Sequence, residues 1–336
     1  MKRVLIVRTD KVGDVVMITP MIREIRNKYP DAFIATLTTP NTSEILYNNP
    51  HLDLLLTDEL SKKTFRKVID KIKTQKFTDA LLTMPTERAA YQLFFAGIKN
   101  RIGVGRKIYE VITFMKSVSR KNYIPLRHEA DYCMDLARAI GINADNITPE
   151  IFITQDERNY GIEMFSKNSS YENSFKIIVH TGSGKSSGNW SEKKYLQLIN
   201  QILAERPGSV IIVTAREMTA PFKNELKNLK DERIIFAVEK IKCLRDLISV
   251  IANADLLIAS STGPLHIASA LNVSTIGLYC HRKMNCSALW GAVGAKAVNL
   301  EISKLYCDSH CGIDKTVCRF EGGISIEEVI SKIKKY

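Results

Sequence analysis

Short apolar runs alternate along the chain with stretches of helical periodicity. In the first half, the runs typical of buried strands are residues 3–7, 32–37, 52–56 and 79–83. Between them, apolar positions recur every three or four residues, as in the segment 13–29, and this spacing predicts amphipathic helices. A further helix is predicted from residue 129 to residue 140, just before Gly141. Strands that alternate with helices are typical of a parallel α/β sheet.

The second half repeats the pattern. Its predicted strands are residues 175–180, 209–214, 233–238, 255–260 and 274–279, and its predicted helices begin near residues 191, 219, 244 and 264. A last helix is expected at 325–335, packed against one of the domains, the N-terminal one included. A chain of 336 residues exceeds the usual size of one hydrophobic core. We therefore predict two doubly wound, Rossmann-like domains, 1–170 and 171–336, joined by a polar hinge at 167–173 and facing each other across a cleft.

Composition narrows the class of protein only a little. The chain is 45% hydrophobic and 25% charged, as in ordinary globular proteins. No apolar run reaches transmembrane length, and no signal-peptide region follows Met1, so a cytoplasmic protein is expected. The formal net charge of +12 favours anionic partners, either phosphorylated small molecules or the inner membrane surface. Nucleic acid is not expected, because the basic residues are dispersed and no binding signature accompanies them. A solvated surface with spare lysines explains the same excess.

The first strand leads into the sequence RTDKVGDVV, which places Asp14 at the start of a helix. A carboxylate there could cap the first helical turn, which is the commoner role at such a position. It could equally act as a general base that takes a proton from an alcohol. The position of Asp14 permits both interpretations.

A second strand-to-helix junction, DLLIASSTGPLHIASAL, has the features of an anion site. The first N–H groups of a helix lack intrahelical partners, and the helix dipole is positive at that end. Thr262 can add a hydroxyl, Gly263 allows close approach of the backbone, Pro264 favours the helix start, and His266 can donate from its imidazole. These residues predict a pyrophosphate cradle. The alternative is an ordinary turn with a solvated histidine.

A glycine-rich loop, HTGSGKSSGNW, follows the first strand of the second half. It fails the P-loop pattern because position 179 is Val, and the dinucleotide fingerprint because position 187 is Ser. The absence of that fingerprint makes a nicotinamide oxidoreductase the least expected enzyme. The loop could still hold phosphate through its amides, with Lys185 as counter-charge. Trp190 is expected to be a packing residue.

Glu217 follows the next strand, where a carboxylate can accept hydrogen bonds from ribose hydroxyls. Its alternative role is capping of the helix that begins near Thr219.

The seven cysteines are expected to be free thiols. Three of them, Cys133, Cys243 and Cys280, occur in apolar segments and are expected in the core. The cluster CDSHCGIDKTVC holds Cys307, Cys311 and Cys318. Its spacing differs from the paired C-x2-C of a common zinc ribbon. We expect no metal in this chain, although this cluster is the candidate site for one.

Taken together, these segments resemble the ADP-heptose:lipopolysaccharide heptosyltransferases of glycosyltransferase family 9. The resemblance covers nearly the whole chain, and its most specific parts are the opening VLIVRTDKVGDVVMITPMIREIRNKYPDAFIATL and the segment LRDLISVIANADLLIASSTGPLHIASALNVSTIGLY. Supporting elements are NPHLDLLL, RIGV from Arg101, HTGSGKSSGNWSEKKYLQL and LWG at Trp290.

The resemblance implies a GT-B fold and an inverting transfer of a sugar, heptose from ADP-heptose, to a lipopolysaccharide-core or related glycan. The donor substrate would be the only small molecule required. Asp14 matches the family's base. The donor would be held by Ser183, Gly184, Lys185, Glu217, Thr262, Gly263 and His266. Candidates for acceptor contacts are Arg88, Arg101 and Arg106, basic residues of the N-terminal domain.

The chain departs from the family pattern at several positions. Gly188 stands where the family often has Lys, and Ser261 stands where it often has Asp. Asp10 and Lys11 replace serines found in many members. Two alternatives therefore stay open: another nucleotide-sugar enzyme on the same fold, such as an epimerase or hydrolase, and a non-catalytic binder of anionic glycolipid.

Overall fold

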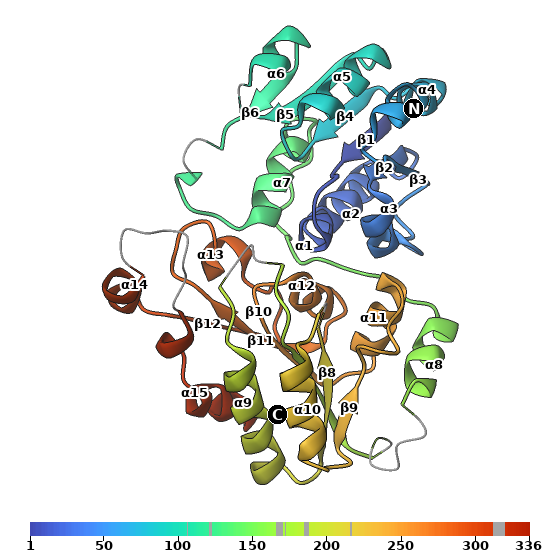
Figure 1. Ribbon diagram of the computed structural model, residues 1–336. Helices are drawn as coiled ribbons and strands as arrows, with labels where there is room; N and C mark the ends of the chain where they lie inside the picture. Colours follow the sequence, from blue (N-terminus) through green and yellow to red (C-terminus); the bar gives the residue numbers. More distant parts are fainter. Residues whose placement is uncertain are drawn as a thin grey trace. The chain divides into compact units, whose positions relative to one another are not determined.

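A computed structural model describes residues 1–105, 107–120, 123–165, 171, 173–184, 188–215, 217–311 and 320–336. The chain forms two compact units, Met1–Phe152 and Ile153–Tyr336 (Figure 1). Each unit contains one six-stranded parallel sheet with its helices.

The first unit is built on a sheet with the order β3-β2-β1-β4-β5-β6. Its strands are β1 (Arg3–Val7), β2 (Phe33–Thr38), β3 (Leu54–Thr57), β4 (Asp79–Leu82), β5 (Asn100–Val104) and β6 (Lys116–Val118). Its helices are α1 (Val12–Val16), α2 (Thr19–Lys28), α3 (Pro40–Ser43), α4 (Phe65–Thr74), α5 (Glu87–Phe95), α6 (Ile108–Ile112) and α7 (Glu129–Arg138). The helical stretch predicted at 13–29 is two helices, because α2 starts anew with Pro20 in its first turn.

The core of the first unit shows why these strands form. β1, β2 and β4 each bury almost every side chain, as expected for parallel strands covered on both faces. One face carries a cluster that includes Leu5, Leu37 and Leu82 together with Val68 and Ile72 of α4. The sequence did not predict β5 and β6. β5 carries Asn, Arg and Gly, and β6 is a short, mostly exposed edge strand, so neither has the apolar signature.

The second unit repeats the same topology. Its sheet order is β12-β11-β10-β7-β8-β9, so both sheets place their strands in the doubly wound order 3-2-1-4-5-6. The strands are β7 (Phe175–His180), β8 (Ser209–Thr214), β9 (Ile234–Phe236), β10 (Leu256–Ser260), β11 (Ser274–Tyr279) and β12 (Ala297–Glu301). The helices are α8 (Gln155–Glu163), α9 (Glu192–Glu205), α10 (Ala220–Asn228), α11 (Leu244–Ile251), α12 (Gly263–Ala270), α13 (Ser287–Trp290), α14 (Lys304–His310) and α15 (Ile326–Ile333).

The boundary between the units lies earlier than the expected one at residue 170. Helix α8 belongs to the second unit, because it packs along α11. Arg158 donates to the carbonyl of Ala252 at 2.7 Å, and Arg245 pairs with Glu157 at 2.6 Å. The hinge expected at 167–173 falls largely outside the described residues.

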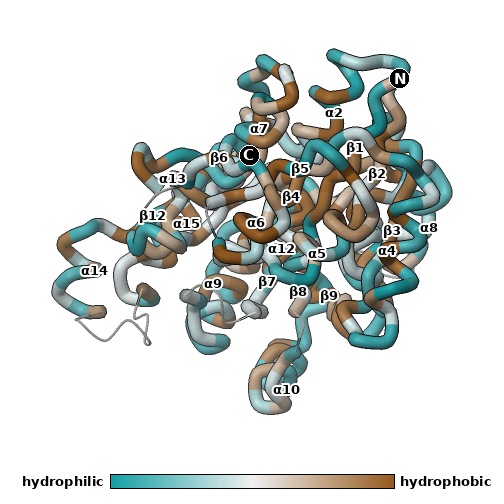
Figure 2. The backbone as a smooth tube through the Cα atoms, turned by 90° about the horizontal axis from the view of Figure 1, so that it is seen from above, coloured by the Kyte–Doolittle hydropathy of each residue, from teal (hydrophilic) through white to brown (hydrophobic). Residues whose placement is uncertain are grey.

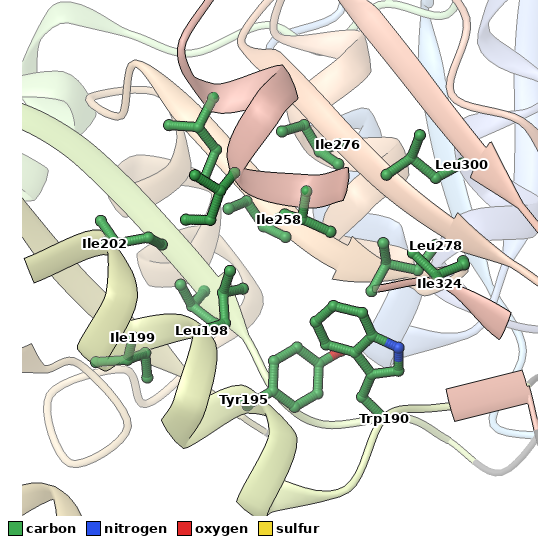
Figure 3. Close-up of a cluster of buried hydrophobic side chains, with 14 of the residues drawn as sticks. Trp190, Tyr195, Leu198, Ile199, Ile202, Ile258, Ile276, Leu278, Leu300 and Ile324 are labelled. Carbon is green, nitrogen blue, oxygen red and sulfur yellow. The ribbon is translucent and has the colours of Figure 1, made fainter. Parts of the chain in front are cut away.

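The C-terminal helix α15 packs on the core of the second unit. Val329, Ile330 and Ile333 of α15 join the core cluster of the second unit, and α15 contacts α9. Arg206 at the end of α9 donates to the carbonyl of Ile333 at 2.6 Å. Figure 3 shows this core, with Trp190 and Tyr195 beside Leu198, Ile258 and Leu278. Trp190 is 2% exposed, which confirms its predicted packing role.

The structure also tests the expected burial of three cysteines and the absence of a membrane-spanning helix among the described residues. Cys133 and Cys280 are buried as expected, but Cys243 is exposed at the N-cap of α11. It precedes an amphipathic helix instead of lying on its apolar face. Among the described residues, no helix combines the length and apolar character that crossing a bilayer requires.

Candidate active site

The loop after β1 lies at the place where ligands usually bind in a doubly wound sheet. β1 pairs with β2 on one side and β4 on the other, and the chain connections diverge at this point. Loops that leave the carboxyl ends of β1 and β4 therefore border a natural crevice. The loop after β1 contains Arg8 and Asp10, and it leads directly into α1 with Asp14 in its first turn.

Asp14 is held by an arginine and not by the helix that it begins. Its Oδ1 accepts a hydrogen bond from Nη2 of Arg8 at 2.5 Å, and its side chain is 15% exposed. The N-cap of α1 is Lys11, whose side chain makes no capping bond. Among the described residues, the carboxylate of Asp14 has no hydrogen bond to a backbone N–H of α1. The side chain of Arg8 therefore holds Asp14 in place, and helix capping does not account for the position of this carboxylate.

The guanidinium of Arg8 is the centre of a buried ionic network. Arg8 is 4% exposed and also donates to Asp10 at 2.8 Å and to Glu129 at 3.0 Å. Glu129 lies in the first turn of α7, and it accepts a second bond from Arg120 at 2.9 Å. Three carboxylates thus share two guanidinium groups, which leaves excess negative charge around Asp14.

Burial, together with the neighbouring charges, sets the protonation behaviour of Asp14. Burial raises the pKa of its carboxyl, and the charge of Arg8 opposes that rise. The charges of Asp10 and Glu129 raise the pKa further, and the result is a pKa of about 6. Such a carboxylate is ionised at neutral pH yet accepts a proton more readily than an ordinary aspartate. That is the property a general base needs.

In the second unit, two loops meet at the equivalent switch point. β7 lies between β8 and β10, so the loops that follow β7 and β10 open at the same edge. Thr262 is the N-cap of α12, with Pro264 in the first turn. The hydroxyl of Thr262 makes no capping bond, and it has no partner among the described residues although it is buried. A buried hydroxyl of this kind is suited to a ligand oxygen.

His266 extends from the first turns of α12. It is 4% exposed, so the alternative of a solvated histidine is wrong. Its ring centroid lies 6.3 Å from that of Trp290, which packs it into the second unit. The predicted cradle therefore has a fixed histidine beside a helix start.

A single asparagine ties the two loops together. The amide of Asn189 donates to the carbonyl of Thr181 at 2.7 Å, and its Oδ1 accepts from Ser260 at 2.7 Å. Tyr195 donates to the same oxygen at 2.9 Å. Asn189 thus links the glycine-rich loop to the end of β10. Sequence reasoning missed it, because its partners are 71 residues away along the chain in one case and local in the others.

Three more predicted donor residues, Ser183, Gly184 and Glu217, follow the carboxyl ends of β7 and β8. Ser183 is partly exposed, and an added Cβ at Gly184 would meet nothing within 4 Å, so the backbone there is open to a ligand. Lys185 lies outside the described residues. Glu217 is exposed after β8. It is not the cap of α10, because Thr219 occupies that position and accepts from the N–H of Phe222.

Two of the predicted acceptor arginines, Arg88 and Arg101, have structural partners. Arg101 is 8% exposed, donates to the carbonyls of Ile98 and Thr113, and so holds α6 against β5. This burial contradicts a direct acceptor contact. Arg88 makes a two-pronged pair with buried Asp58 at 2.8 Å for both bonds. Burial alone would raise the pKa of Asp58, but hydrogen bonds from Arg88 and Gln92 lower it. Arg106 lies outside the described residues.

The candidate cysteine cluster is a packed group of thiols. Cys307 and Cys311 are buried in the second unit's core together with Cys280. Burial and the two neighbouring thiols raise the pKa of Cys307 to about 11. Among the described residues, no group of three or more His, Cys, Asp or Glu is placed to hold a metal ion. Cys318 lies outside the described residues, so the structure does not test this cluster as a metal site.

Similarity to known proteins shows the family of this chain. The model of glycosyltransferase family 9 (heptosyltransferase) matches residues 65–315, most of the chain. The chain belongs to glycosyltransferase family 9. A putative glycosyltransferase of Haemophilus influenzae is 28% identical over 86% of each chain. The lipopolysaccharide core heptosyltransferase OpsX of the same organism is 26% identical, over 83% of this chain and 79% of its own.

A solved structure confirms the GT-B fold of this family 9 chain. The ADP-heptose lipopolysaccharide heptosyltransferase II of Escherichia coli matches it with a TM-score of 0.75 at 18% identity. The match covers 100% of this chain and 98% of the other. Membership of glycosyltransferase family 9 makes the chain a glycosyltransferase.

Proposed function

We propose that the chain transfers a heptose, with inversion, from ADP-heptose to a hydroxyl of a lipopolysaccharide-core or related surface glycan. Family membership and the names of its relatives support the donor and acceptor classes. The observation that carries the proposal is Asp14, a carboxylate held at the carboxyl end of β1 with a pKa of about 6. We place the reaction at the cytoplasmic face of the inner membrane, where a glycolipid acceptor would be presented.

The proposed reaction is a single displacement. The acceptor oxygen forms a bond to the anomeric carbon of the donor sugar while Asp14 takes the hydroxyl proton. The bond between the anomeric carbon and the phosphate oxygen breaks, and the nucleoside diphosphate leaves with the electron pair. Attack from the face opposite the leaving group inverts the anomeric carbon. Arg8 keeps the carboxylate in place through the 2.5 Å bond and balances part of its charge.

The second unit is proposed to hold the donor and to stabilise its leaving group. The hydroxyl of Thr262, the amide of Gly263 and the imidazole of His266 would contact the diphosphate at the start of α12. Ser183, Gly184 and Lys185 would contribute from the loop after β7, and Glu217 would accept from the ribose. One well-placed donor to a developing oxyanion contributes about 3 kcal/mol to catalysis. Amides and one lysine can neutralise a diphosphate, so the proposal requires no metal.

A donor screen tests the substrate class. Purified protein is heated with ADP-, UDP-, GDP- and CMP-sugars, and the apparent melting temperature is recorded, because a bound ligand raises it by mass action. We expect ADP-heptose to give the largest rise. Proton NMR of the product formed with a lipopolysaccharide-core acceptor should then show the inverted anomer. A larger shift with another nucleotide sugar, or release of free heptose without transfer, would contradict the proposal and favour the epimerase or hydrolase alternative.

A further inference from the structure

One surface of the first unit exposes large apolar side chains. Ile108 is 80% exposed, Val111 65% and Ile112 55%, all on α6, and Phe114 just after it is 81% exposed. Helix α5 contacts α6 and adds Phe95, which is 57% exposed. Figure 1 shows the two helices side by side, and the tube along α6 is largely brown in Figure 2. We call these five residues the α5–α6 surface.

This exposure is not a sign of a loosely held segment. Arg101 donates to the carbonyl of Thr113 at 2.5 Å, and the carboxylate of Glu110 accepts from the N–H of Lys107 at 2.9 Å. Tyr109 and Met115 pack on the core of the first unit. The segment RIGV belongs to the same contact, because a Cβ added at Gly103 would lie 2.5 Å from the sulfur of Met115. The fold therefore fixes the inner face of α6 and leaves its apolar outer face uncovered.

Exposed lysines outnumber exposed acidic residues among the described residues of this surface. Glu110 of α6 is buried, and Glu87 at the start of α5 is exposed. Lys99, Lys107 and Lys116 are exposed next to the apolar side chains. Apolar side chains bordered by lysines are the combination that binds the interface of an anionic bilayer. A nucleic acid would have no use for the exposed apolar side chains of the α5–α6 surface. A second copy of the chain, docked by the same surface, would bring its lysines against these lysines.

We propose that the α5–α6 surface docks the enzyme on an anionic phospholipid bilayer. The side chains of Ile108, Val111, Ile112 and Phe114 enter the boundary between headgroups and acyl chains, and the lysines contact the headgroup phosphates. Docking by this surface brings the first unit to the membrane that would present a glycolipid acceptor. The inference uses the acceptor class of the proposed function, but the contact itself needs neither donor nor acceptor.

Vesicle binding tests the docking without any transfer reaction. The full chain is sedimented with vesicles of phosphatidylcholine alone, or with about 30% phosphatidylglycerol, at low and high salt. Ile108→Ser and Phe114→Ser are compared with Leu305→Ser, which changes a residue of the second unit that is also 81% exposed. We expect each of the first two to weaken binding to anionic vesicles about tenfold and Leu305→Ser to bind as the wild type does.

Two charge-reversal variants, one on each unit, test the contribution of the lysines. Lys107→Glu should weaken binding to anionic vesicles several-fold at low salt and little at high salt, whereas Lys304→Glu, exposed on the second unit, should change it far less. Equal binding by all variants, or no binding by the wild type, overturns the inference. A wild-type dimer in light scattering that Phe114→Ser converts to monomer would overturn it too, because a second copy would then be the occupant. None of these results depends on whether the enzyme transfers heptose.

Discussion

Asp14 shares the guanidinium of Arg8 with two other carboxylates, and this arrangement predicts how turnover depends on pH. A base acts only when ionised, and the pKa of Asp14 is about 6. The rate should therefore be constant near neutral pH and fall about tenfold per unit once the pH is well below 6. Steady-state transfer measured between pH 4.5 and about 8 checks this. A rate that stays constant down to pH 4.5 would show that turnover does not depend on the ionisation of Asp14, and would contradict its role as the base.

Glu129 should tune this base without touching substrate. Its charge raises the pKa of Asp14, and it holds Arg8 from the opposite side at 3.0 Å. In Glu129→Gln, the acid limb of the rate profile should shift to lower pH, on the order of half to one unit. Glu59→Gln, an exposed change in the same unit, is the control and should leave the profile in place. A lower rate with an unmoved profile would show that Glu129 only stabilises the fold.

The same pKa predicts a link between stability and pH. Asp14 has a pKa of about 6 in the folded chain against an ordinary value of 3.8, so the folded state binds the proton more tightly. Stability from this group is present below pH 3.8 and is lost as the pH rises through 6. Asp14→Asn should therefore be more stable than the wild type at pH 8, by on the order of 1 to 3 kcal/mol, and the gain should shrink at low pH. Urea unfolding at both pH values measures it, and a variant that is less stable at pH 8 would contradict the charge balance described here.

Single residues were predictable only where the chemistry is local. The Gly-Asp pair after the first strand indicated Asp14, and the Thr-Gly pair before a helix indicated Thr262. Arg8 and Glu129 could not be paired from sequence, because 121 residues separate them. The choice of Arg101 as an acceptor contact failed for a related reason. Residue type alone does not tell a buried guanidinium bonded to carbonyls, such as Arg101, from one that faces a ligand.

At the scale of elements, the bond network of Asn189 should determine how well the donor loops are held. Asn189→Ala removes one hydrogen bond donated to Thr181 after β7 and two accepted from Ser260 and Tyr195, whose hydroxyls keep only their mutual contact at 3.3 Å. The free energy of unfolding should fall by about 1 to 3 kcal/mol. Calorimetric affinity for ADP should also fall, whereas exposed Asn228→Ala should change neither. Unchanged ADP affinity in a destabilised variant would place the donor away from these loops.

Elements with strong local signals were predicted well. The helices expected near residues 191, 219 and 325 begin where Ser191, Thr219 and Ser325 accept capping bonds, which is the chemistry that the sequence displays. Strands β5, β6 and β12 were missed because their partly exposed or polar residues lack an apolar run. Helix α8 was not predicted, and its residues were assigned to the first domain, because its contacts with α11 are tertiary and leave no periodic signal in the sequence.

At the scale of the whole molecule, the alternation of strands and helices was sufficient to predict two doubly wound units, and it also indicated where their functional loops lie. Both sheets have the same strand order, so the loop after the first strand of each lies at a switch point. The first unit presents Asp14 there, and the second presents the loops tied by Asn189. The net charge of +12 could not show that apolar side chains gather on α6 between Lys107 and Lys116.

The most direct test of the base role compares transfer and donor binding in Asp14→Asn. The account predicts a loss of about two to four orders of magnitude in turnover, with calorimetric affinity for ADP unchanged. Asp31→Asn, exposed in the same unit, should keep wild-type values for both. Near-normal turnover in Asp14→Asn would contradict the account, because the proton would then leave the acceptor by another route.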